Sequence, residues 1–205
     1  MARTAVAPAN TDWLHHRMTV TGPADNLAAF QKAAAGAGTV PWRLDLDRIE
    51  EDFFHRLADP GRRTLSLQGA RVLASQLREA VERRHALAVT RVGRSTACPL
   101  DLHALVPVPE DILRLGPDDS AALAWLWAHW GTTEPLRHVE PAPGKHPAPG
   151  RHPDPGGPTS APADHGKPWR LSFWSADWTP WRALARIRLD WPMLSFDVRP
   201  TYDDR

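Results

Sequence analysis

A proline-rich segment at residues 140–168 divides the chain into two stretches that have to supply the hydrophobic core. The segment has almost no large apolar side chain, and proline, glycine and histidine recur along it. A segment of this composition cannot bury enough apolar surface to offset the chain entropy lost on folding. We therefore predict a flexible loop with polyproline character at 140–168 and a folded structure built from the residues on either side.

Before the loop, the chain begins with a pattern that predicts a strand followed by a helix. Residues 16–22 alternate polar and apolar side chains over a short β-branched run, which is typical of a half-buried strand. Pro23 suits the first turn of a helix, Leu27 and Phe30 share one helical face, and Gly36 ends the pattern. The connection between strand and helix is tight.

The pattern repeats after the loop. Residues 169–175 predict a strand, 179–189 a helix, and 193–199 a closing strand, and one further strand is expected at 135–139. The order βαββαβ places two helices on one face of a four-stranded sheet. We therefore predict an α+β fold, in which residues 13–36 and 131–199 form a ferredoxin-like βαββαβ sheet domain.

Between these parts lies a long stretch, residues 40–130, that we interpret as a mainly helical insertion. Helical patterns cover residues 45–58 and 68–94, and a third helix begins at Asp118, Asp119 or Ser120 and ends before Gly131. Residues 102–108 are apolar but are closed by prolines, so we expect an extended segment there. The insertion is larger than either part of the sheet domain.

The charge balance and the cysteine content limit the classes of partner and the compartment that we expect. The 25 lysines and arginines nearly balance 24 acidic residues, so no overall field draws the chain to nucleic acid or membranes. A single cysteine, Cys98, excludes an internal disulfide and fits a reducing compartment. No apolar run is long enough for an export signal or a membrane span. We expect a cytoplasmic protein without membrane partners.

No cofactor or metal site is predicted. His15 and His16 are adjacent in the first strand, so their side chains point to opposite faces of the sheet. The three histidines of the 140–168 loop have no carboxylate or cysteine support. Gly61 and Gly69 are not followed by the lysine–serine pair of a phosphate-binding loop.

Several short motifs together carry a family resemblance. They are Val20-Thr21-Gly22-Pro23 with the helix to Phe30, Leu105–Pro109, Trp130-Gly131-Thr132, Trp169–Ser175 and Trp191–Phe196. With these motifs the chain resembles the YubB-type ferredoxin-like domain family, found in plasmid- and phage-associated bacterial proteins. The resemblance covers roughly half of the chain; residues 40–100 and the proline-rich loop have no counterpart in it, and the family has an asparagine where this chain has His16. It implies a fold and a mobile-element background, and it supplies no catalytic residues.

Ten tryptophans, against one tyrosine, are the most informative residues for function. Most would fill the core, because large aromatic side chains dominate core energetics. Those on the turn between the predicted strand and helix, Trp174–Trp181, could instead form a protein interface together with polar neighbours. The candidate binding residues are Trp130, Trp174, Ser175, Asp177, Trp178 and Trp181.

Our leading hypothesis is a non-enzymatic binding or adaptor protein that contacts a protein partner through this tryptophan-rich surface. The first alternative is nucleic-acid binding through a basic helix, with Arg83, Arg84, Arg91 and Arg94 as candidate residues. The second alternative is an enzyme with a cleft at Asp101 and His103, in which Cys98 could take part. The residue patterns favour an enzyme least, because no nucleophile or substrate groove is recognisable beside the Asp–His pair.

Overall fold

The computed structural model describes residues 12–59, 61, 65–142 and 166–201. It contains a four-stranded sheet and helices, so the predicted α+β class is confirmed. Most of the predicted 140–168 loop, residues 143–165, lies outside the described residues. At its margins, Glu140 and Pro141 belong to a strand, which places the boundary slightly later than predicted.

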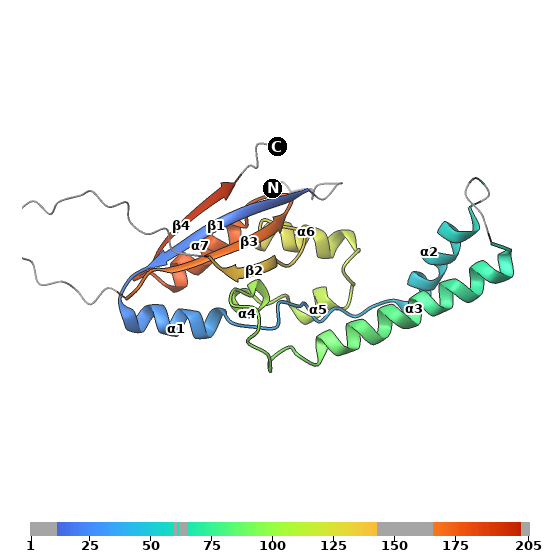
Figure 1. Cartoon of the computed structure of the whole chain (residues 1–205), viewed down its shortest axis with the longest axis horizontal. Helices are drawn as coiled ribbons and strands as arrows, with labels where there is room; N and C mark the ends of the chain where they lie inside the picture. Colours follow the sequence, from blue (N-terminus) through green and yellow to red (C-terminus); the bar gives the residue numbers. More distant parts are fainter. Residues whose placement is uncertain (1–11, 60, 62–64, 143–165, 202–205) are drawn as a thin grey trace, which may run out of the picture.

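The sheet brings both ends of the chain together (Figure 1). Its strands are β1 (Trp13–Thr21), β2 (Arg137–Pro141), β3 (Trp169–Ala176) and β4 (Ser195–Thr201), in the order β2-β3-β1-β4. Each neighbouring pair is antiparallel. The longest strand, β1, therefore pairs on both sides with strands that follow it by about 150 residues or more in sequence.

Two helices, α1 (Ala24–Ala34) and α7 (Trp181–Asp190), cover one face of the sheet (Figure 1). Alternate strand residues point into the core, as the two-residue period of a strand requires. Phe30 of α1 is fully buried, and its ring packs edge-on against those of Trp169, Trp191 and Phe196, with centroids 5.8, 5.3 and 5.2 Å away. Aromatic edge contacts of this kind add to the stabilisation from buried area.

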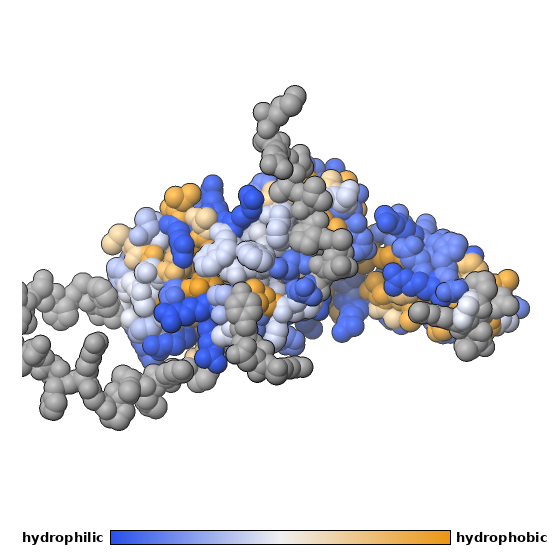
Figure 2. Space-filling model, turned by 90° about the horizontal axis from the view of Figure 1, so that it is seen from above, coloured by the Kyte–Doolittle hydropathy of each residue, from blue (hydrophilic) through white to orange (hydrophobic). Residues whose placement is uncertain are grey.

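The helices α2 (Leu46–Ala58) and α3 (Leu67–Val89) form a hairpin that projects from the body (Figure 1). We call this hairpin the arm. Asp45 caps α2 by accepting from Arg48 N at 3.0 Å, and Ser66 caps α3 by accepting from Gly69 N at 3.0 Å. None of the residues of α2, all of which the structure describes, is buried. Hydrophobic residues therefore reach the surface of the arm (Figure 2).

The predicted helix at 68–94 is too long. It ends at Val89, where Thr90 Oγ1 donates to Leu87 O at 2.8 Å, and a turn follows in which Gly93 adopts a φ of 72°. A hydroxyl that satisfies a terminal carbonyl and a glycine in the left-handed region are typical of a helix end. The last residues of the predicted helix therefore lie outside it.

The predicted extended segment at 102–108 is also wrong. The structure has a short helix, α4 (Leu102–Leu105), because the Asp101 carboxylate accepts from His103 N at 2.9 Å and caps it. A second short helix, α5 (Glu110–Leu113), starts directly after Pro109. The helix α6 (Ser120–His129) begins where predicted, with Asp119 as its cap.

Residues 37–97, which include the arm, begin and end at one point beside the sheet. Gly36 and Cys98 exchange two backbone hydrogen bonds, each 2.9 Å long. Asp101 N also donates to Ala34 O at 2.8 Å. A β-carbon on Gly36 would lie 2.2 Å from Asp101 Oδ2, so this close approach requires glycine.

Within the described residues, no helix has both the length and the apolar character needed to cross a bilayer.

Candidate binding site

A buried polar cluster holds the turn between β3 and α7, residues 177–180. His16 Nε2 on β1 lies 2.8 Å from Thr179 Oγ1. Ser175 Oγ donates to Trp178 O at 2.6 Å and lies 3.4 Å from His16 Nδ1. The side chains of His16, Ser175 and Thr179 are all buried. Because each polar group has a partner, the cluster fixes the turn without leaving an unpaired buried donor.

The loop after α6 fixes the same turn from the other side. Thr132 Oγ1 donates to Ala176 O at 2.8 Å, and the Thr133 hydroxyl donates to the Asp177 carboxylate. Gly131 has a φ of 79°, and a β-carbon there would lie 3.3 Å from Arg182 N. The loop is therefore in close contact with the beginning of α7, and the turn is held between two elements.

Asp177 has a left-handed backbone, with a φ of 63°. Aspartate tolerates this conformation better than most residues because its short polar side chain can bond locally. Here the carboxylate accepts from Thr133 while the backbone N donates to Asp12 O at 2.6 Å. The reversal at Asp177 turns the chain out of the sheet and into α7.

The cluster is uncharged at neutral pH. Burial lowers the pKa of His16 from 6.5 to about 4, and the neighbouring His15 adds to the shift. The imidazole also stacks on Phe173, with the ring centroids 5.0 Å apart and the planes inclined by 12°. A neutral, fully covered histidine is a structural group, so it does not serve as a general base for a substrate.

The tryptophans predicted as binding residues divide into three groups. Trp178 and Trp181 are 59% and 40% exposed, on the turn and at the start of α7. Trp130 is fully buried, with its Nε1 donating to Val106 O at 2.9 Å, so it belongs to the core. Trp174 is half-buried on the other face of the sheet, since it alternates with the buried Ser175. Trp130 and Ser175 are therefore removed from the candidate surface, Trp174 lies on a different surface from Trp178 and Trp181, and the Asp177 carboxylate holds the turn.

Around Trp181 the outer side of α7 forms an apolar stripe. Trp181, Ala185 and Leu189 follow at intervals of four residues, which places them on one helical face, and Leu189 is 76% exposed. Sequence reasoning missed Leu189, although this spacing was readable. Exposed arginines border the stripe. We define the α7 outer surface as Trp178, Trp181, Arg182, Ala185, Arg186, Arg188 and Leu189.

The arginines of the predicted nucleic-acid helix do not form one ridge. Arg83 is paired with Glu79 at 3.4 Å on α3. Arg84 is exposed on the same helix, but Arg91 and Arg94 lie in the turn beyond Val89. The seven-residue spacing of Arg84 and Arg91 aligns side chains only within a continuous helix.

Asp101 and His103 form hydrogen bonds to backbone N atoms that fix the neighbouring chain segments. Asp101 is buried, and its carboxylate accepts from the N atoms of Gly38 and His103 at 2.8 and 2.9 Å. His103 Nδ1 accepts from Val108 N at 3.1 Å, and burial lowers the pKa of its imidazole. Burial raises the pKa of Cys98 to about 11, so its thiol stays protonated. No nucleophile–base pair is formed by these three side chains.

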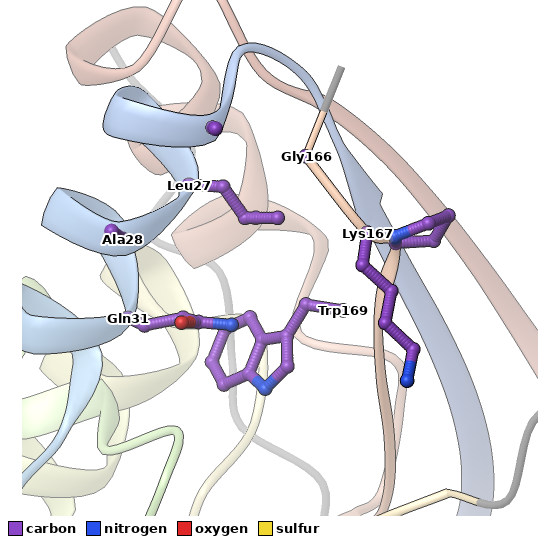
Figure 3. Close-up of a pocket in the computed structure, with 8 residues that line it drawn as sticks. Leu27, Ala28, Gln31, Gly166, Lys167 and Trp169 are labelled. Atoms are coloured by element: carbon purple, nitrogen blue, oxygen red, sulfur yellow. The ribbon is translucent and has the colours of Figure 1, made fainter. Parts of the chain in front are cut away.

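A separate hollow of about 410 Å³ lies between α1 and the start of β3 (Figure 3). Leu27, Gln31 and Trp169 line it, and Gly166 closes one end by donating to Gly22 O at 3.1 Å. Its polar side chains are Gln31 and Lys167, which do not form a catalytic arrangement. Among the described residues, no three histidine, cysteine or carboxylate side chains are grouped as metal ligands.

Comparison of the chain with family models, with curated proteins and with solved structures gave no match. The resemblance to the YubB-type family therefore stays a prediction. The geometry of the described residues supports binding at the α7 outer surface more directly than it supports a reaction.

Proposed function

We propose that this chain is a non-enzymatic binding protein that engages a protein partner through the α7 outer surface. The observation that carries the proposal is the exposure of Trp178, on a turn held by buried hydrogen bonds on both sides, and of Trp181, at the start of the helix that follows. Two large indoles in water lose the stabilisation that burial would give them. A partner that covers them would recover it.

The composition of the surface resembles that of energetic centres in protein interfaces. Tryptophan and arginine are, with tyrosine, the residues most enriched there. The Arg188 guanidinium lies 5.9 Å from the Trp181 ring centroid, and Arg186 is paired with Asp190 at 3.2 Å. Because the turn is already ordered, binding pays little entropy for arranging it.

The charges indicate the chemistry of the partner. Three arginines border the apolar stripe of α7, and Asp190 is the acidic residue of that helix. An acidic segment with one apolar face would cover the indoles and place its carboxylates beside the arginines. We propose a partner of this kind.

We propose that the domain that carries this surface is ferredoxin-like. The basis is the strand order β2-β3-β1-β4, the antiparallel pairing of each neighbouring pair and the two helices on one face. A cytoplasmic location and the mobile-element background remain part of the same proposal. They are supported by the single cysteine and by the family resemblance.

Affinity purification with mass spectrometry tests the proposal. The wild-type chain is compared with the double variant Trp178→Ser/Trp181→Ser and with Leu87→Ser, a control that removes a 65% exposed side chain from the arm. We expect an acidic partner with the wild type and the control, and recovery at least about tenfold lower with the double variant. Raising the salt concentration should weaken retention.

Recovery of the same proteins by the double variant would contradict the proposal. So would the absence of any protein retained by the wild type at low salt. Thermal unfolding of the variants separates loss of binding from loss of fold, because exposed residues contribute little to stability.

A further inference from the structure

The face of the sheet opposite α1 and α7 carries a set of arginines that the proposed function does not use. Met18, Leu171 and Phe196 are buried under the helices, so the residues that alternate with them form the other face. Figure 2 shows hydrophilic side chains on this side of the body. The strand register places on this face Trp13, His15, Arg17 and Thr19 of β1, Arg137 and Glu140 of β2, Arg170, Ser172 and Trp174 of β3, and Asp197, Arg199 and Thr201 of β4.

Positive charge is concentrated on this face. It has four arginines and two carboxylates, and Glu134 pairs with one of these arginines from outside the strands, so one positive charge remains in surplus. Asp197 pairs with Arg199 at 2.9 Å, and Arg137 pairs with Glu134 at 2.5 Å. Among the described residues, Arg17 and Arg170 have no carboxylate partner.

The register brings like charges together on this face, where Asp197 is the carboxylate paired with Arg199. Arg17 lies directly opposite Arg199 across the β1–β4 pair. Like charges in directly opposite positions destabilise a sheet. Arg170 lies opposite Thr19, on the other side of β1 and one diagonal step from Arg17. Three guanidinium groups from three neighbouring strands thus surround one region of the face.

That region is hollowed. A depression of about 550 Å³ is lined by His15, Arg17, Arg170, Ser172, Asp197 and Arg199. The hydroxyl of Ser172 and the guanidinium groups supply hydrogen-bond donors, and guanidinium groups bind phosphate oxygens in a two-pronged geometry. The depression therefore suits a phosphate group.

Aromatic rings lie beside the arginines. The Trp174 and His15 rings are cross-strand neighbours with centroids 5.0 Å apart and planes inclined by 48°. At the edge, the Arg137 guanidinium lies 3.9 Å from the Trp13 ring centroid. Rings next to a positive groove are what unpaired nucleic-acid bases stack on.

We propose that this sheet face binds single-stranded nucleic acid, with Arg17, Arg170 and Arg199 on the phosphates and a base beside Trp174. A duplex keeps its bases stacked inside, out of reach of a flat sheet. An acidic peptide would use the arginines but would gain little from the indole and imidazole. The site lies on the opposite face of the sheet from α7, so it is independent of the α7 outer surface.

Fluorescence anisotropy with labelled single-stranded DNA and RNA of about 16 nucleotides tests the proposal. The wild type is compared with Arg17→Gln/Arg170→Gln and with Arg83→Gln/Arg84→Gln, a control that removes the same charge from the arm. We expect the Kd of the sheet variant to rise at least about tenfold, and the salt dependence of log Kd to fall by about 1.4, because each lost phosphate contact contributes about 0.7. The control should stay within about twofold of the wild type.

Photo-crosslinking of the wild-type chain to 4-thiouridine RNA gives a second measurement that does not depend on the folding of a variant. Crosslinked peptides should come from β1 and β3. Crosslinks confined to residues 83–94, equal loss of affinity in both variants, or no binding at low salt would overturn the proposal. Competition by polyglutamate or duplex DNA as strong as by the unlabelled single strand would also overturn it.

Discussion

His16 Nε2 and Thr179 Oγ1, separated by 163 residues in sequence, are joined by a buried hydrogen bond of 2.8 Å. The bond connects the central strand β1 to the turn that leads into α7. It therefore links the formation of the sheet to the position of Trp178 and Trp181. Replacing either partner should affect the stability of the fold and the display of the two indoles together.

Thr179→Val should lower the free energy of unfolding by about 1–3 kcal/mol, because it leaves a buried imidazole nitrogen without a partner. Thr179→Ser keeps the hydroxyl and should cost clearly less. Urea unfolding followed by circular dichroism measures both. Equal stability of the two variants would show that the hydrogen bond contributes nothing.

Stability should depend on pH through His16. The pKa of its imidazole is lowered from 6.5 to about 4 by burial, so below pH 6.5 the unfolded chain takes up a proton that the folded chain does not. The contribution of His16 to the free energy of unfolding should be fully present above pH 6.5. It should fall by about 3 kcal/mol between pH 6.5 and 4 and stay constant below pH 4. His103, whose pKa is also lowered, acts in the same direction.

His16→Gln is the matched variant for this prediction, because glutamine does not titrate. Urea unfolding at several pH values should give it a flatter profile than the wild type between pH 6.5 and 4. Identical profiles would exclude His16 as the source. The carboxylates titrate in both proteins, so their effect cancels when the profile of the variant is subtracted from that of the wild type.

The left-handed backbone at Asp177 predicts an order of stability among three variants. Asp177→Asn keeps a residue that tolerates a φ of 63° and can still accept from Thr133, so it should be close to the wild type. Asp177→Gly loses the hydrogen bond, and Asp177→Ala loses it and adds about 1–2 kcal/mol of backbone strain. Thermal unfolding should rank asparagine, glycine, alanine. Alanine equal to asparagine would contradict the assignment.

Cys98 should be unreactive in the folded chain. Burial raises the pKa of its thiol to about 11, and the thiolate is the reactive form. Alkylation by iodoacetamide at pH 8 should be on the order of a hundredfold slower than after unfolding in guanidinium. Cys98→Ser, which has no thiol, is the control for labelling at other residues. Fast labelling of the folded chain would revive the enzyme alternative.

Acrylamide quenching should separate the tryptophans by exposure. Trp178→Phe and Trp181→Phe each remove an exposed indole, so the quenchable fraction of the fluorescence should fall. Trp130→Phe removes a fully buried one and should leave that fraction unchanged or higher. A fall with Trp130→Phe as large as with Trp178→Phe would contradict the structure of the turn.

Most of the secondary structure follows from local patterns. The strand ending near Gly22, the helix bounded by Pro23 and Gly36, and the Asp119 cap were predictable, because periodicity and capping residues act locally. The end of α3 was not, because the apolar spacing continues past Val89 to Val92. At 102–108 the flanking prolines suggested an extended chain, but the Asp101 carboxylate caps a helix there.

The sequence predicted where the binding surface lies, but only some of the residues that belong to it. The turn near Trp178 was identified from its tryptophans and polar residues. Trp174 and Ser175 are adjacent in a strand, so the period of two already required them to face opposite sides. The burial of Trp130, in contrast, depends on its contact with Val106, which no local pattern reveals.

The hydrogen bonds between Gly36 and Cys98 hold together the two ends of residues 37–97, which carry the arm. The length of the arm therefore has little effect on the sheet, since doubling a flexible loop costs only about 0.6 kcal/mol in closure entropy. In evolution the arm could therefore lengthen, shrink or be exchanged while β1 and β3 keep their register. The same junction is a natural place to graft a foreign domain onto this scaffold.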